Sequence, residues 1–407
     1  MMKRLLLGFL LMLSGSGLMA QNDTLLVSEA ANDTVGCQLP WPLCMQARLD
    51  SMMQDPLLDY SQLGLMVWDL TADRPLYSHH ERQLMRPAST KKVLTAVAAL
   101  DQLGGDYVFS TSLYYKGSVA GRSLRGDLIV VGGMDPMFDR DDMEALVANV
   151  RRMGIDTLRG RIVCDVSMKD TLRYGEGWCW DDDNPVLTPL RMERRLDFGE
   201  QLLGALQRGG VVTDGASVVR GRLPGGTTFV CARTHTIDQV MFEMMKESNN
   251  LYAESMFYQT ALHAGHRPAT AKDGRKMERD VMLRAGLLPQ QYRIADGSGL
   301  SLYNYLSAEA LTMLLRYAWF DNRIYSHLLP TMPVAAQDGT LKKRFVGTPA
   351  ASNVQAKTGT LTGITSLAGY CTAPDDHRLC FAVIVQGVMH ASEGRDLIDR
   401  LCVELCR

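Results

Sequence analysis

Apolar and polar positions along the chain follow two different patterns. In the first and last parts, apolar residues recur at helical spacing or form short strand-like runs between polar turns. Helices are expected at about 44–55, from Pro87 to Gly104, and at 238–264, 272–286, 307–320 and 392–405. Strands are expected at 63–70, 75–78, 354–360, 365–372 and 379–386. Both ends of the chain therefore contain helices and strands.

The middle of the chain, about 103–235, has a different pattern. Strand-like runs at 110–115, 127–131 and 161–164 accompany one amphipathic helix with apolar positions from Met143 to Met153. We interpret this block as an inserted smaller domain that contains strands. The residues around it, 21–102 and 236–407, would then form one main domain, which the insertion interrupts.

The first twenty residues show the order of features found in a secretory signal. Lys3 and Arg4 form a basic start, Leu5–Leu13 is apolar apart from Gly8, and small residues lead to Ala20. The apolar run is shorter than the ~20 residues that a helix needs to span a bilayer. The pattern therefore predicts a signal peptide, residues 1–20, and a protein secreted across the inner membrane.

Composition argues against several classes of protein. Lys and Arg number 43 against 45 Asp and Glu, so the net charge of −2 leaves no basic surplus for a nucleic acid. The nine cysteines include no C-x-x-C pair and the eight histidines are scattered, so we expect no metal and no organic cofactor. Cys371 and Cys380 flank a polar turn between two expected strands, and we predict a disulfide there, with Cys37–Cys44 as a second candidate. The oligomeric state stays open.

Three short motifs hold residues that can carry chemistry. The first, Ser89-Thr90-Lys91-Lys92, is an S-x-x-K sequence at an expected helix start, where positions i and i+3 share a face. A neutral amine at Lys92 can take the proton of the Ser89 hydroxyl, and free N–H groups at a helix start can stabilise an oxyanion. By itself the motif also fits an N-capped helix with a solvated lysine.

The other two motifs are equally ambiguous alone. Ser248-Asn249-Asn250 is an S-x-N sequence in a helical region, where Ser and Asn also serve as helix caps. Lys357-Thr358-Gly359 lies on an expected strand, which can also end in a surface lysine. In this chain order, S-x-x-K, S-x-N and K-T-G are the motif set of penicillin-binding proteins and class A β-lactamases. The combination predicts a serine acyl-transfer enzyme with Ser89 as its nucleophile.

The chain resembles a known family in longer segments. These are Pro87-Ala88-Ser89-x-x-Lys92, Asp296-Gly297-Ser298-Gly299-Leu300-Ser301, Asp338-Gly339-Thr340-Leu341 and Lys357-Thr358-Gly359-Thr360-Leu361-Thr362-Gly363. They look like class C low-molecular-mass penicillin-binding proteins, which are D-Ala-D-Ala carboxypeptidases and endopeptidases. The resemblance implies an α/β (α+β) fold, an antiparallel sheet flanked by helices, in a periplasmic protein. It also implies a peptidoglycan stem peptide ending in D-Ala-D-Ala as substrate and β-lactam antibiotics as covalent inhibitors.

The resemblance assigns a catalytic role to four residues. Ser89 would attack the carbonyl of the penultimate D-alanine and form an acyl-enzyme, with Lys92 as general base. Ser248 would relay a proton to the departing amine. Asn250 would orient Lys92 and the substrate amide.

Substrate-binding roles are also implied for the K-T-G strand. Lys357 and Thr358 would bind the terminal carboxylate of the peptide. Gly359 would let the substrate backbone lie beside the strand without a Cβ clash. The N–H groups of Ser89 and Thr360 would form the oxyanion hole.

Some features depart from the family or leave alternatives open. Ser89 and Ser248 are closer in sequence than the family leads us to expect, and Cys179 stands where a proline is usual between two tryptophans. Asp165 is predicted to hold a cationic amine of the stem peptide, although it and Asp182 also fit as solvated surface acids. A β-lactamase and a non-catalytic penicillin-binding sensor remain alternatives. Class A β-lactamases deacylate with a separate glutamate, but this chain has no convincing E-x-x-x-N sequence between the first two motifs. Sensors commonly lose a catalytic side chain, whereas here every one is present.

Overall fold

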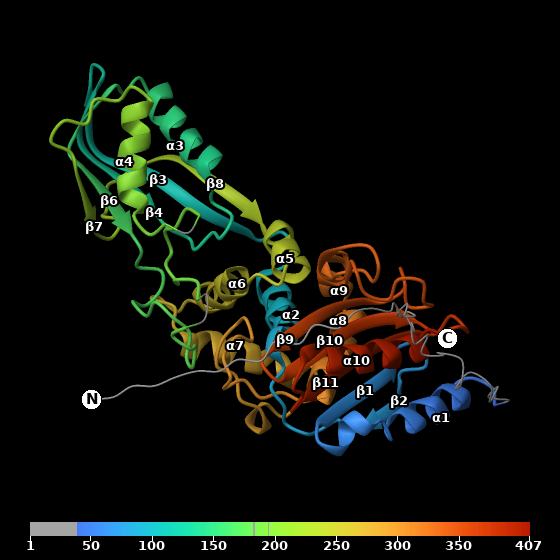
Figure 1. The fold of residues 1–407 in the computed structure, drawn as a ribbon. Coiled ribbons are helices and arrows are strands. Elements are labelled where there is room, and N and C mark those ends of the chain that lie inside the picture. The colour runs from blue at the N-terminus through green and yellow to red at the C-terminus, as the bar shows by residue number, and fades with distance from the viewer. Residues whose placement is uncertain (1–38, 182–183, 194) are drawn as a thin grey trace, which may run out of the picture. The chain divides into compact units, whose positions relative to one another are not determined.

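A computed structural model of the chain describes residues 39–181, 184–193 and 195–407. The expected signal peptide, Cys37 and Asp182 therefore lie outside the described residues. Two β-sheets organise the described part of the chain, one in each of the two regions that the sequence pattern distinguishes (Figure 1). We call residues 103–235 the insert and the remaining described residues the catalytic region.

The sheet of the catalytic region has five strands, each antiparallel to its neighbours, in the order β2-β1-β11-β10-β9. They are β1 (Gln62–Asp69), β2 (Arg74–His79), β9 (Gln355–Leu361), β10 (Ile364–Thr372) and β11 (Arg378–Gln386). Strand β1 comes from the first part of the chain and pairs with β11 near its end (Figure 1). This pairing confirms the expected antiparallel sheet formed by both ends of the chain.

Helices cover both faces of this sheet. The first face carries α1 (Leu43–Met52) and α10 (Ala391–Leu405), which share a core with Val67 and Phe381. The second face carries α2 (Lys92–Leu103), α5 (Ile237–Lys246), α8 (Ala308–Phe320) and α9 (Asn322–Leu328), which share a core with Met66 and Ala382. Neighbouring residues of a strand point to opposite faces, so each central strand contributes to both cores and is buried almost throughout.

The predicted disulfide between Cys371 and Cys380 is wrong. In the hairpin of β10 and β11, Cys371 lies opposite Leu379, and Cys380 lies opposite Tyr370. Because adjacent strand positions alternate between faces, the two thiols point into different cores, Cys371 toward α10 and Cys380 toward α8. Both cysteines are free and buried.

The sheet of the insert is mixed, in the order β7-β6-β4-β3-β8, with β5 beside β4. Its strands are β3 (Val108–Ala120), β4 (Ser123–Val131), β5 (Thr157–Arg159), β6 (Arg161–Asp165), β7 (Ser217–Arg220) and β8 (Thr228–Thr236). Helices α3 (Arg140–Arg152) and α4 (Phe198–Arg208) pack on this sheet through a core that includes Leu113, Ile162 and Leu202. The strands of this sheet fall almost wholly within the interval that the sequence assigns to an insert.

The structure also shows elements that the sequence pattern did not predict. The helix expected at 238–264 is two helices, α5 and α6 (Asn250–His263), separated at Glu247–Asn249. Strands β5, β7 and β8 and helices α4 and α9 were not expected. The short strands carry few apolar residues, so their alternation is weak.

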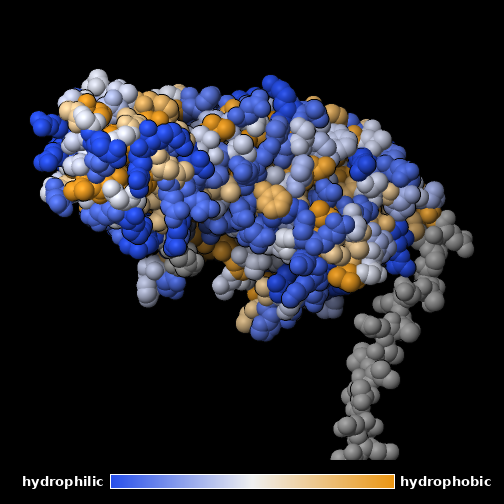
Figure 2. Space-filling model, turned by 90° about the horizontal axis from the view of Figure 1, so that it is seen from above, coloured by the Kyte–Doolittle hydropathy of each residue, from blue (hydrophilic) through white to orange (hydrophobic). Residues whose placement is uncertain are grey.

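The surface shows where apolar side chains are exposed. On the face drawn in Figure 2, hydrophobic residues lie singly or in small groups among hydrophilic ones. Single exposed apolar residues are usual on soluble surfaces, so this face gives no sign of a large apolar interface. None of the described helices is both long and apolar enough to cross a membrane.

Candidate active site

The nucleophile candidate Ser89 lies on a tight turn that leads into α2. The turn is a 3-10 segment, Ala88–Lys91, in which Ala88 has a positive φ of 50°. The hydroxyls of Thr90 and Ser366 both donate to the carbonyl of Pro87, at 2.6 and 2.7 Å, and fix the turn against β10. Ser89 remains partly accessible while its neighbours are buried, as a nucleophile requires.

Lys92, one turn later, lies directly behind Ser89. Its Nζ is 2.9 Å from Ser89 Oγ and donates to Asn250 Oδ1 and to the Ser298 carbonyl, both at 2.8 Å. Burial lowers the pKa of Lys92 to about 7, although the nearby charges of Asp296 and Glu254 act in the opposite direction. At neutral pH a large fraction of this amine is therefore unprotonated and can accept the serine proton.

The S-x-N motif and the K-T-G motif meet on the other side of the site. Ser248 lies between α5 and α6 with a positive φ of 61°. Lys357 on β9 donates from Nζ to Ser248 Oγ at 2.8 Å and to the Thr358 carbonyl at 2.7 Å. Burial and the nearby Lys92 hold the pKa of Lys357 well below its usual range.

The two asparagines of the S-x-N motif have different partners. Asn249 is the N-cap of α6, and its side chain accepts a hydrogen bond from the backbone N–H of Leu251 at 3.1 Å. Asn250 is the first residue of the helix, and its amide oxygen accepts from Lys92 instead. The capping interpretation therefore applies to Asn249, while Asn250 belongs to the site.

Strand β9 packs against the nucleophile turn at Gly359. A Cβ added there would lie 2.2 Å from Ser366 Oγ and 2.8 Å from the Pro87 carbonyl, so only glycine allows this approach. The neighbouring Thr358 donates from Oγ1 to Thr340 Oγ1 at 2.8 Å, and Thr360 is exposed. The structure thus brings Ser89, Lys92, Ser248, Asn250 and the K-T-G strand together, and gives Gly359 a packing role that the sequence did not reveal.

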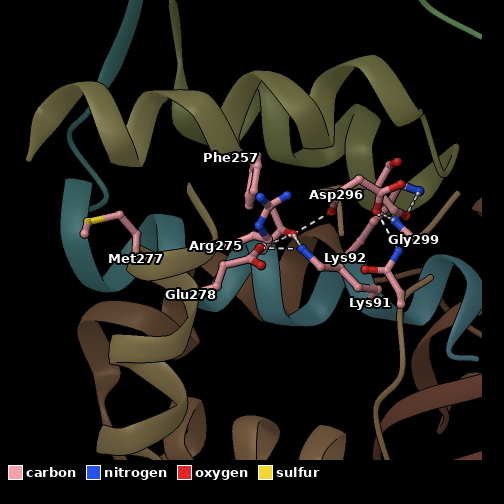
Figure 3. Close-up of polar contacts among 12 residues, drawn as sticks. Lys91, Lys92, Phe257, Arg275, Met277, Glu278, Asp296 and Gly299 are labelled. Atoms are coloured by element: carbon pink, nitrogen blue, oxygen red, sulfur yellow. Dashed lines mark hydrogen bonds and ion pairs between the residues drawn. The ribbon is translucent and has the colours of Figure 1, made fainter. Parts of the chain in front are cut away.

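Three buried acids near the lysines were not predicted to take part. Glu254, on α6 one turn after Asn250, accepts from the backbone N–H of Ser298 at 2.8 Å. Burial, assisted by the charge of Asp296, raises the pKa of Glu254 to about 7. Figure 3 shows Asp296 beside Lys92 and Glu278 beside Lys91. The i, i+4 spacing from Asn250 on one helix face is the sequence signal that could have indicated Glu254.

Lys91 belongs to the core beneath the site. It is fully buried, forms an ion pair with Glu278, and donates to Thr95 Oγ1 at 2.9 Å (Figure 3). The Thr95 hydroxyl, with its single proton, lies 2.9 Å from Glu278 Oε1 and 2.6 Å from the Gly297 carbonyl, so it can donate to either acceptor. These bonds hold α2 against α7 (Ala271–Arg284) and the loop after residue 295, so Lys91 is structural.

Among the residues that the structure describes, Asp165 forms its hydrogen bonds away from these side chains. It lies at the end of β6 and is 5% exposed. Its two carboxylate oxygens accept from the backbone N–H groups of Ser167 and Leu223, at 2.9 and 2.6 Å. Both oxygens already have partners within the insert, so the geometry gives no support to the predicted substrate contact.

A cavity of about 570 Å³ opens beside Asn250. Residues 249–252, which include Asn250 of the S-x-N motif, line one side of it, and the insert lines it with residues that include Pro136 and Val186. Ser89 and Lys357 do not line this cavity, so it meets the catalytic residues only at Asn250. The insert therefore forms part of the wall next to the site.

This geometry defines a serine enzyme whose nucleophile is activated by a lysine. A sequence model of the D-Ala-D-Ala carboxypeptidase 3 (S13) family matches residues 45–190 and 187–405. The chain therefore belongs to this family, and it is a serine-type D-alanyl-D-alanine carboxypeptidase. The predicted enzyme class is confirmed.

Similar proteins include two bacterial carboxypeptidases. The D-alanyl-D-alanine carboxypeptidase DacB of Haemophilus influenzae is 24% identical over 421 residues, covering 83% of this chain and 88% of the relative. The D-alanyl-D-alanine carboxypeptidase of Actinomadura sp. (strain R39) is 26% identical, covering 88% of this chain and 84% of the relative. The crystal structure of penicillin binding protein 4 (dacB) from Haemophilus influenzae has a TM-score of 0.77 at 23% identity, covering 88% of this chain and 98% of that chain. This structural likeness confirms the fold class.

Proposed function

We propose that the protein cleaves peptidoglycan stem peptides ending in D-Ala-D-Ala through an acyl-enzyme on Ser89, and that penicillin acylates the same serine. The observation that carries the proposal is the position of Lys92 Nζ, 2.9 Å from Ser89 Oγ, together with a pKa of about 7. A serine next to a neutral, buried amine is an activated nucleophile at physiological pH.

In the acylation step, Ser89 Oγ bonds to the carbonyl carbon of the penultimate D-alanine and its proton passes to Lys92. The developing oxyanion is stabilised by the N–H groups of Ser89 and Thr360. The close packing of Gly359 on the nucleophile turn supports this assignment, because a Cβ there would be 3.0 Å from the Ser89 nitrogen.

The leaving group is the terminal D-alanine, which must gain a proton on its amine as the C–N bond breaks. Ser248 can relay that proton: its hydroxyl gives its own proton to the amine and regains the one that Lys92 took from Ser89, so both Ser248 and Lys92 return to their starting states. The hydrogen bond of Ser248 to Lys357, and that of Asn250 to Lys92, support this role. Water then attacks the acyl-enzyme, and the peptide acid leaves with regeneration of the Ser89 hydroxyl.

The substrate carboxylate is proposed to bind at Lys357 and Thr358. Lys357 is buried, and a substrate carboxylate bound next to it would supply a partner of opposite charge. That partner would raise the pKa of the amine back toward its usual range. Thr358 offers a hydroxyl that now bonds to Thr340.

Similar proteins of known structure support the proposed endopeptidase action and the proposed acylation by β-lactams. Penicillin binding protein 4 from Haemophilus influenzae has been solved in complex with a β-lactam. A predatory peptidoglycan endopeptidase from Bdellovibrio bacteriovorus, Bd3459, matches with a TM-score of 0.58 at 16% identity. We propose that the present protein acts on the same polymer, in the periplasm, after removal of residues 1–20.

One assay separates this function from the two alternatives. Purified mature protein is incubated with a D-Ala-D-Ala pentapeptide, a cross-linked dimer and nitrocefin, and in parallel with labelled penicillin. We expect D-alanine release, covalent label on the peptide that contains Ser89, and little nitrocefin turnover. Rapid nitrocefin hydrolysis without D-alanine release would indicate a β-lactamase, and labelling without any turnover would indicate a sensor.

Location is tested separately by N-terminal sequencing of the exported protein. A mature chain that begins at Gln21 supports the proposed signal peptide. A chain that retains Met1 would refute it.

A further inference from the structure

One turn of the insert touches the loop that positions Lys92. Trp178 donates from Nε1 to Asp296 Oδ2 at 2.8 Å, although the two residues are 118 positions apart. Asp296 begins the Asp296-Gly297-Ser298-Gly299-Leu300-Ser301 segment, to which the catalytic mechanism assigns no step. This hydrogen bond connects the insert directly with the catalytic region.

Asp296 organises this loop through its carboxylate. Besides Trp178, it accepts from the backbone N–H groups of Gly299 and Ser301, at 2.8 and 2.7 Å, and from the side-chain amide of Asn304 at 2.8 Å. It is 1% exposed, so each of these four donors replaces a water that burial removed. The carboxylate is the centre around which the loop folds, as Figure 3 shows for Gly299.

The loop contacts the reacting residues at two points. The Ser298 carbonyl accepts from Lys92 Nζ at 2.8 Å and so fixes the direction of the amine. Gly299, with a φ of 82°, packs on the nucleophile turn so closely that a Cβ would lie 2.0 Å from the Ala88 carbonyl. A small shift of the loop would therefore move both Lys92 and the backbone next to Ser89.

The turn that carries Trp178 is built to reach this loop. Gly177 has a φ of 74°, and a Cβ there would lie 2.5 Å from Tyr303 and 2.8 Å from Ser301 Oγ. Glu176 forms ion pairs with Arg275 and Arg293, at 3.0 and 3.2 Å. The turn is thus held on the loop by close packing, by charge and by the indole hydrogen bond.

We propose that Trp178 is a positioning residue for catalysis: through Asp296 it sets the orientation and the charge environment of Lys92. The indole N–H neutralises part of the Asp296 charge, which would otherwise stabilise protonated Lys92. Through this contact the insert affects the orientation of Lys92 and the fraction of its amine that is unprotonated. This inference rests on the proposed role of Lys92 as the base.

The test compares Trp178→Phe with Trp180→Phe. The first change keeps an aromatic ring but removes the donor, and the second alters a side chain that is 94% exposed two positions away. Acylation by a fluorescent penicillin is followed by stopped flow from pH 5 to 9, which separates the initial binding constant from the acylation rate constant.

For Trp178→Phe we expect the acylation rate constant at pH 7 to fall about tenfold, with little change in initial binding. The acid limb of the pH profile should move to higher pH, because Asp296 without its donor raises the pKa of Lys92. Trp180→Phe should match the wild type in both respects. A wild-type profile in Trp178→Phe, or a lower rate with an unmoved acid limb, would overturn the proposal, since a merely structural role predicts the latter.

A second variant covers the case in which Trp178→Phe does not fold. Glu176 is exposed and only holds the turn, so Glu176→Gln should fold and should lower the acylation rate constant a few-fold with unchanged initial binding. An unchanged rate constant would refute the inference. Failure of the wild-type protein to react with penicillin at all would refute the proposed function instead, so the two failures are distinguishable.

Discussion

Buried charges are arranged differently in the catalytic region and in the insert. In the insert, Asp135 is 2.7 Å from His235, Asp142 is 2.7 Å from Arg233, and Asp165 is held by backbone N–H groups. Each of these acids has its partner within the insert. The catalytic region also has a buried ion pair, Lys91 with Glu278. It differs in Lys92 and Lys357, which are both fully buried and which, within the described residues, have no carboxylate at ion-pair distance.

This difference distinguishes buried charges that stabilise the fold from buried charges that serve catalysis. A buried charge with a nearby partner is a structural feature, because the partner opposes the effect of burial on its pKa, as His235 does for Asp135. A buried lysine without such a partner is costly and is driven toward its neutral form, which is the form that a general base needs. The pKa of Lys92, lowered to about 7, and the lowered pKa of Lys357 therefore mark the site more clearly than any single motif does.

The largest effect should come from the nucleophile itself. Ser89→Ala removes the only atom that forms the acyl-enzyme, so we expect loss of both penicillin labelling and D-alanine release. Gel fluorescence with labelled penicillin and a D-alanine assay measure the two activities. Ser118→Ala, at an exposed position in the insert, serves as the control. Labelling that survives Ser89→Ala would place the nucleophile elsewhere.

Acylation should depend on pH through Lys92. Only the neutral amine accepts the serine proton, so below a pH of about 7 the acylation rate should fall about tenfold for each pH unit. Above that pH the rate should level off, because the amine is already neutral. Stopped-flow acylation between pH 5 and 9 measures the inflection, and circular dichroism at each pH checks that the protein stays folded. Because burial raises the pKa of Glu254 to about 7 as well, Glu254→Gln is the control, and an inflection that disappears in this variant would contradict the role of Lys92.

A smaller and more selective effect is expected at Lys357. If this lysine binds the terminal carboxylate, Lys357→Ala should reduce kcat/KM for a pentapeptide acid by at least about tenfold. The loss should be smaller for the C-terminally amidated peptide, which carries no charge to recognise. Lys342→Ala, at an exposed position, is the matched control. Equal losses on acid and amide would show that Lys357 acts only through Ser248.

Much of the catalytic region could be predicted from the sequence because its signals are local. Its signals are strands rich in apolar residues, helices with one apolar face, and three short motifs, and each depends on a few neighbouring residues. The register of the β10–β11 hairpin cannot be predicted from such local signals. Cys371 pairs with Leu379, one residue away from the pairing with Cys380 that a disulfide would need, so the two thiols lie on opposite faces of the sheet. The contact between Trp178 and Asp296 joins residues far apart in sequence, and no periodicity indicates it.

The smallest catalytic effect is expected at Asp165. This substitution tests whether a buried, hydrogen-bonded acid of the insert contributes to stability rather than to catalysis. Asp165→Asn keeps one acceptor oxygen but replaces the other with an amide N–H, which would face the backbone N–H of Ser167 or of Leu223. We expect the free energy of unfolding to fall by about 1 kcal/mol, because one buried hydrogen bond is lost. Penicillin acylation and D-alanine release should stay within about twofold of the wild type, since neither oxygen faces the catalytic residues. Thermal unfolding and both kinetic assays, with peptides that do and do not carry a cationic third residue, measure these effects. Slower turnover of the cationic peptide alone, with unchanged stability, would restore the substrate-binding role that the sequence suggested for Asp165.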